Sequence, residues 1–296
     1  CLSNLRQAGI GMYTYGAEND DYYPGMNTSG AKMSGPLSDA DKVALANTSP
    51  DRPLQADDWV SPSLGFGLAL PKDARERMLA IFREDFRCPT NEVLYRGLFA
   101  SGDIYGLGNE VIPVSSYSMN SVWQLRKDGD TSSDLMDGDS GAFMSEIDGN
   151  FGTGWRFDGI RNASTKVVVS EGARYMGDPT ESDGEVTYNG IAGYVGGTNF
   201  SHNGWIYSGS GGAPYRWGTG NQSTNTVDIE DVALGSRSNA FRHPQTSINQ
   251  LKFDGSGENA SVAEAVKIER HVPSGSVVTG TADTPDPDDF NGMVVQ

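Results

Sequence analysis

The chain has 296 residues, of which 39 are acidic and 22 basic, and its formal net charge at pH 7 is −17. A field of this sign repels nucleic acid phosphates and anionic lipid, so the composition excludes nucleic acid as a partner. Hydrophobic residues make up 36% of the chain, enough for a core. No apolar run approaches the ~18–20 residues that a membrane-spanning helix needs.

The first predicted element is a helix over the opening residues, followed by a turn. An apolar stripe at helical spacing predicts this helix, and it consists of Leu2, Leu5, Gly9 and Met12. The polar residues 19–21 break the period, and residues 22–24 lead out of the turn. No Ser, Thr, Asp or Asn precedes Leu2 as a cap, so we expect the helix to begin upstream of Cys1.

One further helix and two strands are predicted after a polar stretch. Residues 25–57 are rich in Ser, Asp and Pro, and we expect them to form a long surface excursion. Residues 72–84 have an apolar helical face and predict a second helix. Strands are predicted around 115–123 and 166–170, and the β-branched run in the second predicts a central strand.

The remaining stretches are predicted to be loops and a tail. Residues 128–160 and 177–225 are rich in Gly, Asp, Asn and Ser, which indicates long loops and not a second compact domain. Residues 281–296 combine prolines with four aspartates and are expected to form an extended acidic tail.

Five short motifs, in their order along the chain, resemble those of one protein family. They are CLSNLRQAGIGMYTYGAENDDYYP at residues 1–24, Asp58-Trp59, Phe86-Arg87-Cys88-Pro89, Ser116-Tyr117-Ser118-Met119-Asn120, and Phe241-Arg242-His243 with Phe253-Asp254-Gly255. The set resembles pseudopilin-like proteins with a prepilin-type N-terminus, which are relatives of the major pseudopilin of type II secretion. The family usually has nine residues between its His and Asp-Gly, whereas this chain has ten.

The resemblance implies an α+β fold, namely a pilin-like head whose N-terminal helix packs on an antiparallel β-sheet with long loop insertions. Residues 1–24 would be the end of the pilin-type helix and its turn, 25–280 the head, and 281–296 the tail. The implied function is a non-enzymatic structural subunit of a pilus-like filament or pseudopilus, bacterial, exported, and extracellular or at the cell surface. Its partners would be copies of itself and the secretion or pilus assembly machinery. An apolar helix upstream of Cys1 would provide both self-assembly and the only membrane contact.

The two cysteines, Cys1 and Cys88, each flank one of these motifs. A disulfide between them and two separate buried thiols are both compatible with the sequence. A third hypothesis places a lipid on Cys1, as in a lipoprotein.

No established catalytic motif is present, which favours a non-enzyme. The signature His243, Asp254 and Gly255 contains a His and a carboxylate, but the sequence points to no nucleophile beside them. We expect His243 to bind the backbone or a carboxylate and so to hold the strand and turn that follow.

Calcium is the ion that the sequence supports best, because Ca²⁺ is bound by six to eight oxygen atoms from clustered carboxylates and carbonyls. The resemblance to calcium-binding major pseudopilins supports this expectation. The alternative is a solvated acidic surface. Three candidate clusters are Asp128, Asp130, Asp134, Asp137 and Asp139; Asp254 and Glu258; and Asp286, Asp288 and Asp289.

Aromatic residues concentrate in a Gly-rich region and suggest a second function. Exposed aromatics can stack on sugars, whereas buried ones form a core or a subunit interface. The candidates are Trp155, Trp205, Tyr207, Tyr215 and Trp217. The alternative function is therefore a secreted or lipid-anchored carbohydrate-binding surface protein.

Overall fold

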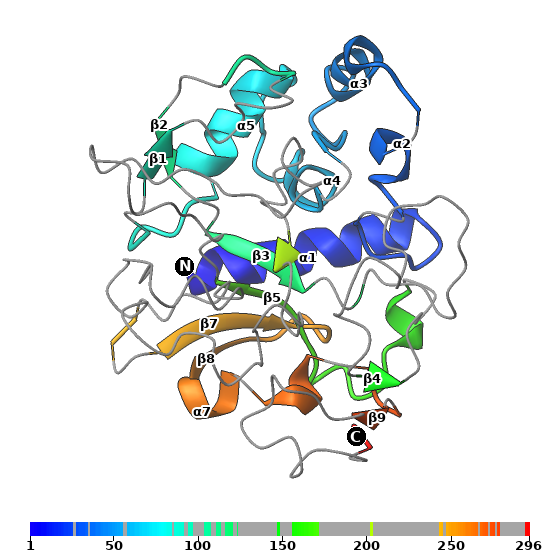
Figure 1. Ribbon diagram of the computed structural model, residues 1–296, viewed down its shortest axis with the longest axis vertical. Helices are drawn as coiled ribbons and strands as arrows, with labels where there is room; N and C mark the ends of the chain where they lie inside the picture. Colours follow the sequence, from blue (N-terminus) through cyan, green and yellow to red (C-terminus); the bar gives the residue numbers. More distant parts are fainter. Residues whose placement is uncertain are drawn as a thin grey trace.

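The computed structural model has an α+β fold in which helix α1 lies between a sheet and a group of short helices (Figure 1). It describes residues 1–25, 28–34, 36–55, 58–84, 86–91, 94–96, 104–107, 111–113, 116–120, 123, 147–148, 156–171, 202–203, 243–244, 247–265, 267–271, 273–275, 277–278 and 294–296. No helix among these residues is both long and apolar enough to cross a bilayer.

Helix α1 spans Leu2–Glu18, as the apolar stripe predicts. Its buried face includes Leu5, Gly9 and Met12, which pack toward β7, β8 and α4. Gly11 permits the close approach to α4, because a Cβ there would overlap the carbonyl oxygen of Ser63. The helix ends at the predicted polar residues, of which Asp20 and Asp21 have left-handed backbone angles (φ 51° and 68°).

Within the described residues, the main sheet has five strands in the order β6-β3-β5-β7-β8. The strands are β3 (Tyr117–Asn120), β5 (Val167–Glu171), β6 (His202–Asn203), β7 (Ser247–Lys252) and β8 (Gly257–Ser261). All pairs are antiparallel except β3 and β6. Both predicted strands are confirmed, and β5 is central and buried along its whole length.

Smaller elements complete the described part of the chain. Two two-stranded sheets pair β1 (Leu94–Arg96) with β2 (Val111–Pro113), and β4 (Ile147–Asp148) with β9 (Val277–Val278). The short helices beside the main sheet are η3 (Phe157–Gly159), α7 (Val262–Ala265) and η6 (Ile268–Arg270).

The other side of α1 is covered, in the part of the chain that the structure describes, by α2 (Ala31–Ser34), α3 (Asp39–Ala46), α4 (Val60–Leu64) and α5 (Ala74–Arg83). The predicted helix over 72–84 is confirmed as α5, whose N-cap Asp73 accepts a hydrogen bond from the Glu76 N–H. The expectation that 25–57 is a surface excursion holds only in part, because residues 36–41 are exposed whereas other described residues of this stretch are buried. Ser38 caps α3, and residues of this stretch enter the core, among them Met33, Ala46 and Leu54.

An aromatic cluster fastens the end of α1 to the sheet. The Tyr23 hydroxyl donates to the Trp123 carbonyl, and Trp123 Nε1 donates to the Val167 carbonyl at 2.8 Å. Phe253 packs edge-to-face against both rings. Burial of these large rings supplies a substantial part of the hydrophobic stabilisation around the turn.

The last three residues, which are the described part of the acidic tail expected for 281–296, contact Lys166 just before β5 and Gly275. Val295 is buried, and the Lys166 ammonium donates to the carbonyls of Gln296 and Glu269, each at 2.6 Å. Burial lowers the pKa of Lys166 to about 8. A buried ammonium needs acceptors, and these two carbonyls provide them. Residues 281–293 lie outside the described residues.

We predict that His271 makes the fold sensitive to mild acid. The ring is fully buried, its Nε2 lies 2.6 Å from the Ala265 carbonyl oxygen, and burial lowers its pKa to about 3. In the unfolded chain the pKa is about 6.5, so the unfolded state binds more protons between these values. The free energy of unfolding should therefore fall as pH drops from about 6.5 toward 3. Denaturation midpoints at pH 7.5 and 5 should differ less in His271→Gln than in the wild type, and equal differences would contradict this role.

Candidate functional site

A disulfide joins the start of α1 to the Cys-Pro element. Cys1 and Cys88 are bonded with their Cα atoms 4.9 Å apart, and Cys88 is fully buried. The bond thus links two of the sequence motifs that are 87 residues apart. The alternative of two separate thiols is not what the structure contains.

A buried carboxylate lies beside this disulfide at the end of the central strand. Glu171, the last residue of β5, is fully buried, and its Oε1 lies 3.6 Å from Cys88 Sγ. The backbone N–H of Asn249 donates to the other carboxylate oxygen at 2.9 Å, and its side-chain amide donates to Oε1 at 3.0 Å. These bonds hold the carboxylate in one orientation.

His243, which lies four residues before the first residue of β7, completes the group. Its Nε2 lies 2.8 Å from each oxygen of Glu171 and 2.7 Å from Asn249 Nδ2, so this nitrogen faces the cluster. The backbone of His243 pairs with Ser247 in an antiparallel bridge. His243 therefore binds a carboxylate and holds the beginning of the strand, as the sequence suggested.

Four groups with metal-binding atoms meet here, namely Cys1, Cys88, Glu171 and His243. One ligand atom from each lies within 4.8 Å of the others. Among the described residues this is the one gathering of three or more such side chains. We call it the Cys-Glu-His cluster.

The second half of the signature forms the β7–β8 turn and is separated from His243. Strand β7 lies between His243 and Asp254, a span of roughly 20 Å at the usual rise of a strand. Gly255 has φ +79°, a conformation that glycine adopts readily. Tyr13 of α1 donates to the Phe253 carbonyl, so this turn is a docking point for the helix. The described residues do not bring His243 and Asp254 together as a catalytic pair.

The carboxylates of the second calcium candidate have protein partners. Glu258 forms ion pairs with Lys252 at 2.7 Å and with Arg270. Asp254 accepts hydrogen bonds from the backbone and hydroxyl of Ser256 at 2.9 and 2.6 Å. These contacts give the pair structural roles in the hairpin. The clusters at 128–139 and 286–289 lie outside the described residues, as do the aromatic candidates Trp155, Trp205, Tyr207, Tyr215 and Trp217.

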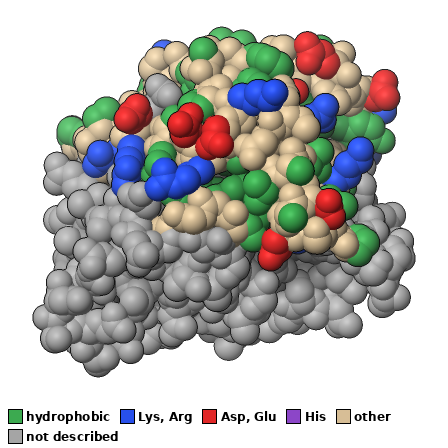
Figure 2. All heavy atoms as spheres, turned by 90° about the horizontal axis from the view of Figure 1, so that it is seen from above, with side chains coloured by type: hydrophobic (Ala, Val, Ile, Leu, Met, Phe, Trp, Pro, Cys, Tyr) green, Lys and Arg blue, Asp and Glu red, His purple; other side chains and the backbone are tan. Residues whose placement is uncertain are grey.

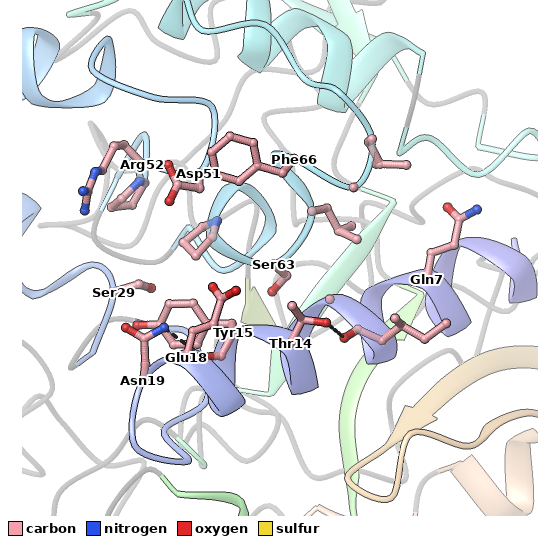
Figure 3. Close-up of a pocket in the computed structure, with 17 residues that line it drawn as sticks. Gln7, Thr14, Tyr15, Glu18, Asn19, Ser29, Asp51, Arg52, Ser63 and Phe66 are labelled. Atoms are coloured by element: carbon pink, nitrogen blue, oxygen red, sulfur yellow. Dashed lines mark hydrogen bonds between the residues drawn. The ribbon is translucent and has the colours of Figure 1, made fainter.

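A hollow of about 600 Å³ opens between α1 and the segment 51–68 (Figure 3). From α1, Gln7, Thr14 and Glu18 line one side, and Asp51, Arg52 and Phe66 line the other. The side chains of Ile10 and Phe66 are each 70% exposed although both are large and apolar. We call this hollow the α1 groove. Its exposed apolar side chains and its charges of both signs suit a protein segment better than a single small ion.

The face of the molecule that lies at the top of Figure 1 carries charges of both signs. Figure 2 shows the face at the top of Figure 1, where Lys and Arg side chains lie among Asp and Glu with hydrophobic side chains between them. The net charge of −17 therefore does not appear as a single-sign patch on the described part of this face.

Glu171 and Asn249 are functional-site residues that were not predicted from the sequence. Glu171 follows directly on the β-branched run 166–170, so a carboxylate at the end of a predicted central strand was the available signal. No sequence signal marked Asn249, because a polar residue inside a strand is ordinarily expected to face solvent.

Comparisons with family models, curated proteins and solved structures gave no match for this chain.

Proposed function

We propose that this protein is a structural subunit of an extracellular or cell-surface pilus-like filament, and that its α+β fold is a pilin-like head. The observation that carries the proposal is the double attachment of α1. At its start the helix is bonded covalently to Cys88, and at its middle Tyr13 is bound to the turn that contains Asp254 and Gly255. A filament subunit must transmit force from its helix to its head, and this arrangement supplies two anchor points.

The disulfide supports the exported location, because such bonds persist in oxidising compartments. The absence of established catalytic motifs in the sequence favours a structural role over an enzymatic one. Calcium binding and a contact with assembly machinery remain predictions of the same proposal.

The α1 groove supplies a surface for head-to-head contact. Ile10 and Phe66 expose apolar area that a second copy of the chain would bury, and Asp51, Arg52 and Glu18 would set the register. Large exposed side chains at a concave site are typical of an interface centre. A second copy is the occupant we propose because the helix itself forms one wall of the groove.

The test begins with the protein isolated from its native source. Top-down mass spectrometry should find further residues ahead of Cys1 that begin at a methylated residue and contain ~20 apolar residues, the length of a membrane-spanning helix. Electron microscopy of the same material should show filaments. A native chain that starts at Cys1 and sediments as a monomer would refute the proposal, and binding of that monomer to polysaccharide would favour the carbohydrate-binding alternative.

A matched pair of variants tests the groove. Phe66→Ser should reduce filament yield at least about tenfold, because truncating an anchor at an interface centre costs about 2 kcal/mol or more. Val294→Ser is the control, since Val294 is also apolar and 57% exposed but does not line the groove. Both changes are at exposed positions and should leave the melting temperature of the monomer nearly unchanged. Equal filament yields from the two variants would remove the groove from the assembly contact.

A further inference from the structure

We propose that the Cys-Glu-His cluster is a zinc site in the reduced protein, and that zinc binding and the Cys1–Cys88 disulfide exclude each other. The inference is independent of the filament proposal. Zinc prefers four ligands of S, N and O type in a tetrahedral arrangement. Cys1, Cys88, His243 and Glu171 offer two sulfurs, one ring nitrogen and one carboxylate.

The distances suit this ion. Bond lengths of about 2.0–2.3 Å place tetrahedral zinc ligands about 3.3–3.8 Å from one another. Cys88 Sγ is already 3.6 Å from Glu171 Oε1, and all four ligand atoms lie within 4.8 Å of each other. Reduction lets the two sulfurs move apart to this spacing without moving the chain far, because the cysteine Cα atoms are only 4.9 Å apart.

The surroundings orient the ligands as a metal site requires. Outer contacts that fix ligand geometry strengthen metal binding. Asn249 holds the Glu171 carboxylate through its backbone N–H and its side-chain amide. The His243 backbone bridge to Ser247 sets the position of the ring, whose Nε2 faces the cluster. Cys88 and Glu171 are buried, whereas Cys1 is partly exposed and the side chain of His243 is 15% exposed, which leaves an entry path on that side of the group.

The negative charge of the two thiolates explains why only the reduced form should bind zinc. In the disulfide neither sulfur is a thiolate, so His243 and Glu171 alone face the site. A phosphine or dithiol reductant converts the bond to two thiols and is itself oxidised. Zinc then displaces one proton from each thiol, and two thiolates with one carboxylate surround the cation. Every newly made chain passes through this thiol state before its disulfide forms.

The test compares the oxidised and the reduced 296-residue chain, with cobalt as a spectroscopic substitute for zinc. The reduced chain should bind one equivalent and show thiolate-to-cobalt charge-transfer absorption with the visible bands of a tetrahedral ion. The oxidised chain should show neither. Zinc should displace the cobalt, raise the melting temperature of the reduced chain and slow its reoxidation, because the bound thiolates are not free to react.

Three variants separate a four-residue site from binding by the thiols alone. His243→Gln and Glu171→Gln should each weaken cobalt binding at least about tenfold, since loss of even an outer contact costs 10–100-fold. Asp254→Asn is the control, because Asp254 lies in the β7–β8 turn away from the cluster and should leave the affinity unchanged. Unaltered affinity in both Gln variants would overturn the site, as would equal binding by the oxidised chain.

Folding of the reduced chain is followed by circular dichroism in the same samples. If reduction unfolds the chain, one equivalent of zinc should restore its spectrum. A reduced chain that neither binds cobalt nor refolds with zinc would also refute the proposal.

Discussion

Replacing Arg77 by Met should lower the free energy of unfolding by about 3–5 kcal/mol, because the change removes a buried positive charge that lies near the buried carboxylate of Asp58. Arg77 projects from α5 and is fully buried, although it lies on a helix with exposed charged residues. Its Nη2 donates to the carbonyls of Ala46 and Arg52 at 2.8 and 3.0 Å. Its Nη1 donates to two further carbonyls, those of Pro71 and Lys72, at 3.0 and 2.8 Å.

The loss would have two parts. Four carbonyls would lose a charged donor, and such hydrogen bonds contribute about 1.5–3 kcal/mol each before relaxation. Asp58 would also lose a nearby positive charge, and burial already raises the pKa of this carboxyl group. Hydrogen bonds from the Leu54 and Ser61 N–H groups, at 2.8 and 2.9 Å, would remain as its partners.

Urea denaturation of the purified chain measures the effect through the midpoint at constant slope. Arg161→Met is the matched control, because Arg161 is exposed and the same change should cost less than about 0.5 kcal/mol. Arg77→Lys should recover only part of the loss, since an ammonium does not reproduce the planar fork that reaches separate carbonyls. A loss below about 1 kcal/mol in Arg77→Met would show that the guanidinium does not organise these loops.

Removing the disulfide should cost about 2–5 kcal/mol of unfolding free energy, because it closes a long loop in the unfolded chain. The bonded residues are 87 positions apart, so the reduced unfolded chain gains much conformational freedom. The start of α1 would also lose its covalent link to the Cys-Pro element. The double variant Cys1→Ala with Cys88→Ala isolates this effect, since it has no thiols to bind metal.

The measurement is the difference in denaturation midpoint between the oxidised wild type and the double variant. Wild-type chain that is reduced in the presence of a chelator should match the variant. Equal midpoints for oxidised wild type and variant would show that packing of α1 alone holds its start in place.

Hydrophobic period and turn chemistry were sufficient to predict several elements. Leu5 and Met12 at helical spacing gave α1 its buried face, and the polar residues after Glu18 marked its end. The β-branched run before Glu171 predicted the central strand. These signals are local, because a helix or strand shows its buried face in the order of its own residues.

Long-range partners were not visible in the same way. Residues 25–57 appeared polar, yet Leu54 enters the core and Arg77, from a helix further along the chain, binds the carbonyls of Ala46 and Arg52. Such a contact depends on where a loop meets a helix, which no local pattern records.

The sequence by itself determined the opening helix with its turn, the helix α5, the positions of two strands and an acidic composition. Only the tertiary structure decided that Cys1, Cys88, Glu171 and His243 meet, and that Asp254 belongs to a different end of β7. Periodicity reports which way a side chain faces along one element. The Cys-Glu-His cluster joins groups from the start of α1, the Cys-Pro element, the end of β5 and the segment just before β7, and only the packing of those elements brings them within bonding range.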